Sequence, residues 1–154
     1  DAEFLPFRSN SFDLAFGKDA LHHVTNPTGV LREMRRCVKD GSKIVSIEAN
    51  PLNPQMALIG LIYYPVDKGV FRNRRKNLTK FFLSSDLRDI HVLYKEFLPR
   101  NILFYVSSPL QKLWKKYPSL LHVIEKINNV ERRMEKNRYI RRFSNFLVVT
   151  GTKK

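Results

Sequence analysis

The chain has 154 residues, of which 43% are hydrophobic and 12% aromatic, and it carries 28 lysines and arginines against 14 aspartates and glutamates. This composition excludes a disordered chain and fits one domain that can bury a core. The net charge of +14 favours an anionic partner, which could be nucleic acid, an anionic membrane surface or an acidic small molecule.

The only cysteine is Cys37, so an intramolecular disulfide is excluded and we expect a reducing, cytoplasmic setting. Its helical, apolar surroundings predict a buried small hydrophobic side chain and not a nucleophile. The sequence has no run of about 18 apolar residues and no basic-then-apolar start, which argues against a membrane span and a signal peptide.

The N-terminal part of the chain is expected to contain a strand and a ligand-binding loop. Residues 11–17, Ser-Phe-Asp-Leu-Ala-Phe-Gly, predict a short buried strand that a glycine closes. Residues 18–23, Lys-Asp-Ala-Leu-His-His, follow as a loop rich in donors and acceptors of hydrogen bonds. Ligands of open α/β sheets bind outside the carboxyl ends of the strands, and this loop has that position.

A helix and a second strand follow. Asn26 is a good N-cap and Pro27 suits the first helical position, while Gly41 is expected to end the helix as a left-handed C-cap. Residues 43–48 are mostly apolar, which predicts a parallel strand covered on both faces. The resulting βαβ unit would bring Glu48, at the end of its second strand, beside the loop at 18–23.

Four sequence blocks, taken together, resemble the second half of the class I S-adenosylmethionine-dependent methyltransferases of type 11. They occur in the order and at the spacing of that family, and the resemblance covers roughly residues 1–50. The blocks are Asp-Ala-Glu-x-Leu-Pro-Phe at 1–7, Ser-Phe-Asp-Leu-Ala-Phe at 11–16, Ala-Leu-His-His-Val at 20–24, and Leu-Arg-Glu-Met-Arg-Arg at 31–36 with the turn Lys39–Gly41.

This resemblance implies an incomplete Rossmann-like α/β fold. It would contain the strands counted fourth to seventh, with a reversed hairpin edge at the end, and would lack the N-terminal donor-binding half. Because the chain begins without Met and inside a motif, we expect a fragment of a longer protein. Its first strand would then form an exposed sheet edge, a site of possible self-association.

We expect one partial methyltransferase domain over residues 1–154. Residues 1–50 would form the βαβ core with the donor and active-site loops, residues 51–83 a variable insertion in the substrate region, and residues 84–154 the C-terminal strands and helices. Within the insertion, an apolar stretch at 55–64 predicts three helical turns, and a basic segment follows it.

Five elements are expected in the C-terminal part, and one of them is ambiguous. They are a capped helical turn at 84–88, a strand at 90–97, an ambiguous segment at 101–116 that Pro109 interrupts, an amphipathic helix after Pro118, and a strand at 143–150 that Gly151 closes.

The resemblance also implies roles for residues near the donor, S-adenosylmethionine. It places the carboxylate of Asp1 and the backbone N–H of Ala2 at the adenine. It places main-chain atoms of Gly17 and Lys18 beside the methionine part, and it includes Leu21 in the same donor site. From the residues alone, Asp1 could simply be a loop carboxylate.

Three residues are candidates for catalysis. Either His22 or His23 could face the ligand as a general base, while the other caps or packs, because adjacent side chains point in different directions. Glu48 could orient the substrate or accept a proton, or it could be a strand-terminal carboxylate paired with a cation. No metal site is expected from these histidines with His91 and His122, since no HxxxH spacing or cysteine pair supports one.

For the intact protein, methyl transfer to a small or lipid-like acceptor is the favoured function, because an apolar segment at 56–64 adjoins a basic cluster. An RNA-directed methyltransferase is one alternative, and a non-catalytic basic interaction protein with a degenerate methyltransferase fold is another. The six glycines are all isolated, so the chain as given has no Gly-rich donor loop and is not expected to bind the donor tightly.

Overall fold

A four-stranded sheet organises the computed structural model, which describes residues 1–97 and 120–154. The strand order is β1-β2-β4-β3, with β1 parallel to β2 and with β4 antiparallel to both of its neighbours. The last strand in sequence, β4, therefore lies between β2 and β3 and runs antiparallel to both. This confirms the prediction that the sheet ends in a reversed hairpin. The strands are β1 (Phe12–Lys18), β2 (Val38–Ala49), β3 (Leu87–Lys95) and β4 (Phe146–Lys153).

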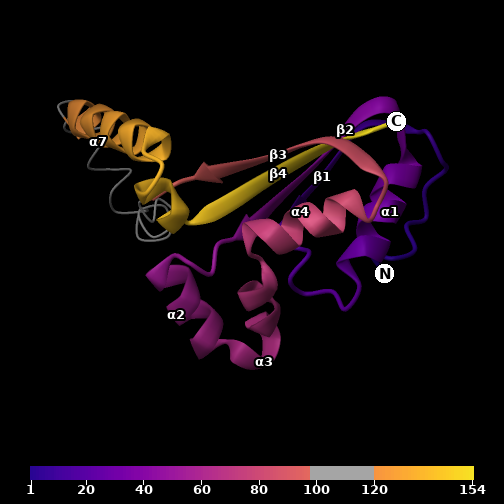
Figure 1. Cartoon of the computed structure of the whole chain (residues 1–154), viewed down its shortest axis with the longest axis horizontal. Helices are drawn as coiled ribbons and strands as arrows, with labels where there is room; N and C mark the ends of the chain where they lie inside the picture. The colour runs from indigo at the N-terminus through magenta and orange to yellow at the C-terminus, as the bar shows by residue number, and fades with distance from the viewer. Residues whose placement is uncertain (98–119) are drawn as a thin grey trace.

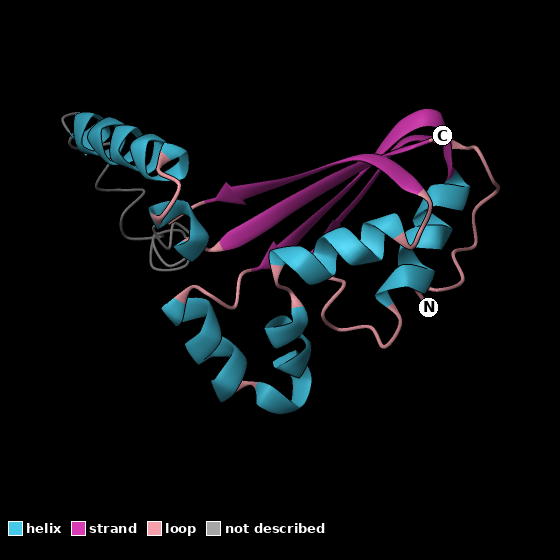
Figure 2. Cartoon of the chain, viewed as in Figure 1, coloured by secondary structure: helices cyan, strands magenta, loops and turns pink. Residues whose placement is uncertain are grey.

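Helices lie on one face of this sheet and beyond one end of it. Helices α1 (Pro27–Cys37) and α4 (Arg75–Leu83) lie side by side against the sheet (Figure 1). Helix α2 (Pro54–Ile62), the short helix α3 (Tyr64–Asp67) and the 3₁₀ turn η1 (Lys68–Arg72) form a separate lobe, and α7 (Leu120–Lys136) and η2 (Ile140–Phe143) precede β4 (Figure 2). We call α2, α3 and η1 the helical lobe.

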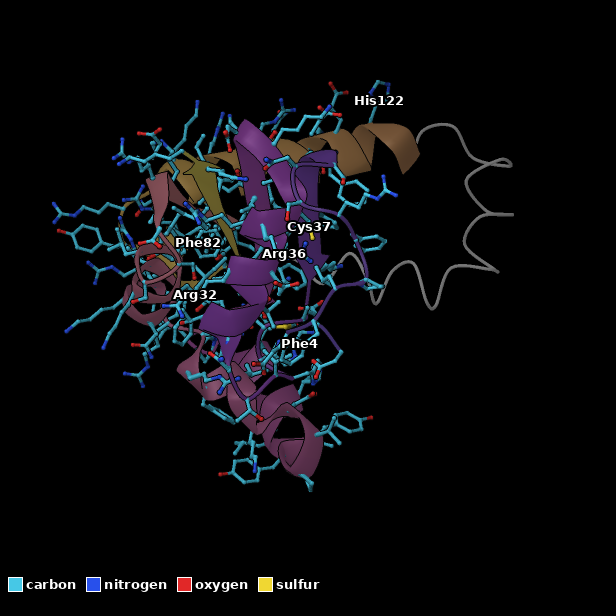
Figure 3. The ribbon with its side chains drawn as sticks, turned by 90° about the vertical axis from the view of Figure 1, so that its right-hand side faces the viewer. Phe4, Arg32, Arg36, Cys37, Phe82 and His122 are labelled. Atoms are coloured by element: carbon cyan, nitrogen blue, oxygen red, sulfur yellow. The ribbon has the colours of Figure 1, made fainter. Side chains whose placement is uncertain are left out.

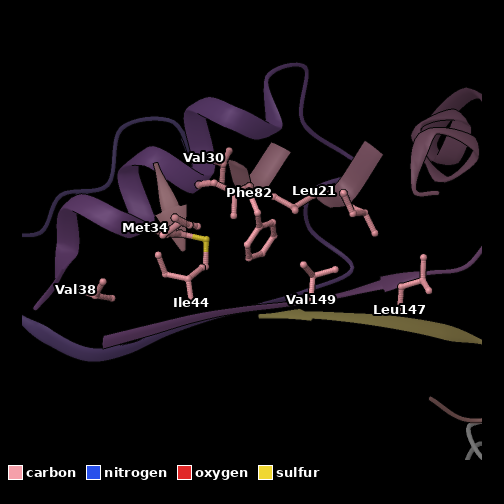
Figure 4. Close-up of a cluster of buried hydrophobic side chains, with 11 residues drawn as sticks. Leu21, Val30, Met34, Val38, Ile44, Phe82, Leu147 and Val149 are labelled. Carbon is pink, nitrogen blue, oxygen red and sulfur yellow. The ribbon is translucent and has the colours of Figure 1, made fainter. Parts of the chain in front are cut away.

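The hydrophobic core lies between the sheet and the pair α1 and α4 (Figure 4). Alternate residues of the strands point into it, as a period of two requires. The ring of Phe82 on α4 is fully buried and packs with Ile44 and Val149 from the sheet and with Leu31 and Met34 from α1. These contacts fix the position of β2, and so of Glu48 at its end.

The opposite face of the sheet is open over the described residues. Leu14 and Phe16 on β1 are 55% and 58% exposed, and Leu93 on β3 is 49% exposed. The prediction of a buried first strand is therefore wrong. The strand predicted at 43–48 is covered fully on the face of α1 and α4 and only in part on the other face, where Val45 and Ile47 are half-buried and α7 borders the sheet at one end. In the described ranges β1 pairs with β2 alone, which confirms the predicted sheet edge.

Helix α1 begins as predicted and ends earlier. The Asn26 side chain accepts a hydrogen bond from the Gly29 N–H at 3.0 Å, and Pro27 is the first helical residue. Gly41 is not the C-cap: the helix ends at Cys37 and the backbone passes directly into β2. Gly41 does have a positive φ of 78°, but it lies in the irregular part of β2, where the pairing with β1 shifts.

The later elements agree with the predictions in kind more than in extent. Helices at 55–64 and after Pro118 are present, as are the strands predicted at 90–97 and 143–150 with ends shifted by a few residues. The helical turn at 84–88 is wrong, because α4 ends at Leu83 and β3 begins at Leu87. The ambiguous segment at 101–116 lies outside the described residues. Cys37 is buried, as predicted.

Arg36 attaches the N-terminal segment to α1 (Figure 3). Its guanidinium forms a bidentate pair with Glu33, both contacts at 2.9 Å, and also donates to the carbonyls of Leu5 at 3.0 Å and Phe7 at 2.8 Å. The Glu33 carboxylate accepts the Leu5 N–H at 3.1 Å. The hydrogen bond from Arg36 is the main cause that lowers the pKa of Glu33.

Gly69 allows the helical lobe to approach the loop after β1. A Cβ at this position would lie 1.8 Å from the carbonyl oxygen of His22, which is backbone and cannot swing away. By contrast, a Cβ at Gly17 would have its nearest neighbour, the side chain of Ala20, at 3.8 Å. A close contact of two backbones therefore fixes the distance between η1 and the loop that contains His22.

We expect Glu33→Gln to destabilise the protein near neutral pH and to have a vanishing effect in strong acid. The pKa of Glu33 is lower in the folded state, so its stabilising effect is present above the unfolded pKa and is lost as the pH falls through the folded pKa. Thermal unfolding across this pH range measures it, with exposed Asp89→Asn as the control. An equal loss of stability at all pH values would contradict the role of the charge.

We expect Gly69→Ala to destabilise the protein by about 1–3 kcal/mol or more, because the added methyl group forces η1 away from the loop at His22. Chemical denaturation measures this change. Gly17→Ala is the matched control and should change the free energy of unfolding by less than about 0.5 kcal/mol. Equal effects of the two substitutions would show that the close backbone contact is absent.

Candidate active site

The carboxylate of Glu48 is the centre of a buried hydrogen-bond network at the carboxyl end of β2. Glu48 is fully buried, and its Oε1 accepts the Leu21 N–H at 3.0 Å and the Ser46 hydroxyl at 2.8 Å. Its Oε2 contacts His22 Nδ1 at 2.9 Å and accepts from Asn73 Nδ2 at 3.1 Å. Four partners satisfy the oxygens, which is what a buried carboxylate requires.

The two adjacent histidines have different surroundings. His22 is 7% exposed, and because Glu48 accepts from Nδ1, the lone pair of His22 lies on Nε2. The His22 and His23 rings lie 4.0 Å apart between centroids, and the His23 side chain is 44% exposed. His22 is thus the histidine that a carboxylate orients, in the arrangement that general-base catalysis uses.

A hollow of about 360 Å³ adjoins these histidines, within the size range of small-molecule sites. The loop after β1 forms one wall, and α2 and η1 form another. Apolar and polar side chains both line it. The apolar side includes Met56, Ile59 and Val70, and the polar side includes Asp19, His22, His23, Asp67 and Asn145.

Carboxylates gather at this hollow although the chain as a whole is strongly basic. Asp19 lines it beside the histidines, with a positive φ of 51° and its N–H donating to the Ile47 carbonyl at 2.8 Å. Burial is the main cause that raises the pKa of Asp19, and the nearby charge of Glu48 raises it further. With Asp67, three carboxylates therefore surround two imidazoles.

A second hollow, of about 400 Å³, lies on the β1 and α1 side of the loop. Of the residues predicted at the donor, Ala2 and Gly17 line it, together with Ala20. Asp19 and Ala20 are adjacent in sequence yet line different hollows, so the loop separates the two spaces.

The structure places the other predicted donor residues outside both hollows. Asp1 is exposed, and its Oδ1 accepts the Glu3 N–H at 2.9 Å. Lys18 directs its Nζ over the Phe146 ring, 5.2 Å from the centroid. Leu21 is 2% exposed in the core, and its N–H is bound to Glu48.

Three residues of this site were not predicted from the sequence. Asp67 ends α3 and faces both histidines, at 4.0 Å from His22 Nε2 and 3.7 Å from His23 Nδ1. Asn73 donates to Glu48, and Arg72 donates to the carbonyls of Leu21 and Val24. These residues follow the apolar helix α2 and are not part of any recognisable sequence motif, so the sequence does not indicate their role. The fold alone brings them to the loop.

Comparison with known proteins gives matches of two kinds. Residues 1–46 match the family model of the methyltransferase domain. Ubiquinone/menaquinone biosynthesis C-methyltransferase UbiE of Cupriavidus pinatubonensis is 44% identical over 48 residues, which are 31% of this chain and 20% of that protein. The UbiE of Azotobacter vinelandii is 41% identical over 66 residues, 41% of this chain and 24% of that protein. The matched part thus spans about a fifth to a quarter of these relatives.

Solved structures match nearly the whole chain in fold. An S-adenosylmethionine-dependent methyltransferase of Thermotoga maritima superposes with a TM-score of 0.60 and 16% identity, over 99% of this chain and 61% of that one. Phosphoethanolamine N-methyltransferase 2 of Haemonchus contortus, in complex with S-adenosylmethionine, gives a TM-score of 0.56 and 17% identity, over 99% of this chain and 36% of that one. At this identity the likeness concerns the fold.

None of the helices in the described ranges is long and apolar enough to cross a membrane.

The sheet with its reversed strand, the superpositions and the match over residues 1–46 agree with one another. The chain therefore has the Rossmann-like fold of the S-adenosylmethionine-dependent methyltransferases to which it is similar, and its residues 1–46 match the methyltransferase domain model.

Proposed function

We propose that the chain forms the acceptor side of an S-adenosylmethionine-dependent methyltransferase and that the intact protein methylates a small or lipid-like molecule. The contact between His22 Nδ1 and Glu48 Oε2, at the wall of a partly apolar hollow, is the observation that carries this proposal. It supplies an oriented base beside a space in which an acceptor could bind.

In this mechanism His22 removes a proton from the acceptor. The donor, S-adenosylmethionine, supplies a methyl group on a positively charged sulfur. As the acceptor atom would bond to that methyl, the methyl–sulfur bond would break with its electron pair left on the neutral sulfide, and the acceptor's proton would pass to His22 Nε2. Glu48 holds Nδ1–H and stabilises the imidazolium that forms. The protein contributes mainly by holding donor, acceptor and base in line.

The position of the two hollows supports this division of roles. Ala2 and Gly17, which the family resemblance assigns to the donor, line the hollow on one side of the loop. His22 and His23 line the hollow on its other side. In-line transfer needs the donor methyl and the acceptor atom about 3–3.5 Å apart, so the two ligands would have to meet at the edge of the loop at residues 19–23, between the ends of β1 and β2. We assign the donor to the hollow lined by Ala2 and Gly17 and the acceptor to the hollow lined by His22 and His23, which we call the acceptor hollow.

The outer surface of the helical lobe supports a lipid-like acceptor. Leu61 and Ile62 on α2 are 60% and 64% exposed, while Met56 and Ile59 of the same helix line the acceptor hollow. A helix that is apolar on all sides is expected to be buried in protein or in lipid. Exposed basic residues follow it in sequence, so an anionic membrane surface suits both its apolar and its charged side chains.

We expect His22→Asn to lower kcat by about 10²–10⁴-fold while leaving donor binding intact, because asparagine keeps a donor for Glu48 and removes the Nε2 base. Donor binding is measured by calorimetry, on this chain and on the chain joined to the coding sequence upstream of Asp1. His23→Asn is the matched control and should retain most of the activity. Absence of donor binding in the longer protein would favour the non-catalytic interaction protein.

We expect Leu61→Ser and Ile62→Ser together to weaken binding to anionic vesicles by about tenfold or more, because two exposed apolar side chains no longer enter the lipid. Vesicle sedimentation measures this affinity. Leu83→Ser, 60% exposed on α4, is the control and should bind as the parent chain does. Salt-sensitive binding to RNA with no binding to vesicles would favour the RNA-directed alternative.

A further inference from the structure

Three side chains that bind metals in many proteins converge at the acceptor hollow. His22 and His23 come from the loop after β1, and Asp67 comes from the end of α3. One ligand atom from each residue lies within 4.8 Å of the other two. His91 and His122 are not part of this group, which is the one that the described residues contain. Two imidazoles and a carboxylate are a common ligand set for zinc.

The distances are those of an open site and not of a closed ion pair. Asp67 Oδ1 lies 4.0 Å from His22 Nε2 and 3.7 Å from His23 Nδ1, both beyond hydrogen-bond length. A tetrahedral ion with bonds of about 2.1 Å holds its ligand atoms about 3.4 Å apart. Small movements of Asp67 and His23, which are partly exposed, would close the site around an ion.

The surroundings of His22 are those of a metal ligand. Metal-bound histidines usually donate their other ring N–H to a carboxylate, which fixes the tautomer and directs the lone pair at the metal. Here Nδ1 is held by Glu48 at 2.9 Å, and Nε2 is directed toward Asp67. Because Glu48 is fully buried and has three further donors, it cannot easily turn away.

The local charge also favours a cation. Three of the 14 acidic residues, Asp19, Glu48 and Asp67, lie at or beneath this hollow in a chain of net charge +14. Of the basic side chains nearby, Arg72 is turned to the carbonyls of Leu21 and Val24, and Lys18 lies over the Phe146 ring and acts on Asp19. A divalent ion between His22, His23 and Asp67 would offset the remaining negative charge.

We propose that His22 Nε2, His23 Nδ1 and the Asp67 carboxylate bind one divalent transition-metal ion of the zinc type, with Glu48 as the outer partner that orients His22. The remaining coordination position faces the hollow and would hold water or a donor atom of the acceptor. Nitrogen ligands select zinc, cobalt or nickel over magnesium. One consequence rests on the proposed function: an occupied Nε2 cannot accept a proton, so the ion inhibits methyl transfer that depends on His22.

Calorimetry with ZnCl₂ tests the site without any activity assay. The protein used carries no histidine tag and is freed of metal beforehand. We expect one Zn²⁺ per chain, no binding of Mg²⁺, and a visible absorption band when Co²⁺ replaces Zn²⁺. His23→Ala and Asp67→Asn should each weaken Zn²⁺ binding by more than about 100-fold, because each removes a ligand. Both side chains are partly exposed, so these variants are expected to fold, which thermal unfolding checks.

His91→Ala and His122→Ala are the matched controls and should bind Zn²⁺ as the parent chain does. Unchanged binding in Asp67→Asn and His23→Ala would overturn the site, as would an equal loss in the controls. Zinc binding that leaves methyl transfer unaffected would overturn the base role of His22 and keep the site. Methyl transfer that needs His22, in a protein that does not bind Zn²⁺, would overturn the site and keep the proposed function.

Discussion

The buried carboxylate of Glu48 is the constraint on which the rest of the site depends. An isolated buried carboxylate costs several kcal/mol, so the chain must bring donors to it. It does so from three places: the loop after β1 through Leu21 and His22, β2 itself through Ser46, and the C-terminal end of η1 through Asn73. One charge thereby joins the sheet, the loop and the helical lobe. The same contacts direct His22 Nε2 into the hollow, so the fold and the chemistry of the site depend on one network.

Local rules predicted the first part of the fold well. The Asn26 cap, the apolar spacing of α1 and the apolar run of β2 each depend only on residues close together in sequence. The structure contains all three. The predictions failed where position in the whole sheet decides. Gly41 has the expected positive φ, yet it serves an irregular strand and not a helix end, because α1 stops at Cys37. The exposure of Phe16 depends on which face the helices cover, and no periodicity of β1 contains that information.

The sequence predicted those residues of the site that the βαβ topology brings together, and it missed those that a contact between distant segments brings there. His22, His23 and Glu48 follow strands that a βαβ unit brings together, so their proximity was expected from topology. Asp67 and Asn73 reach them only because Gly69 lets η1 pass against the backbone of His22. That contact joins residues far apart in sequence, and no sequence motif at either residue predicts it. No metal site was expected from the histidines because the sequence has no HxxxH spacing or cysteine pair. Asp67, which converges on them in the structure, comes from α3, a helix whose place the sequence does not specify.

The buried carboxylate network and the edge at β1 lie in different parts of the sheet. Glu48, Ser46 and the core residues point to the face that α1 and α4 cover, where burial strengthens the hydrogen bonds of the carboxylate. The edge at β1 and the hollow lined by Ala2 and Gly17 lie at the border of that packing. The hollow lined by His22 and His23 is thus built from contacts within the described chain, through Glu48 and η1. The hydrogen bonds that orient His22 do not involve the edge at β1, so the position of its imidazole ring does not depend on what binds there.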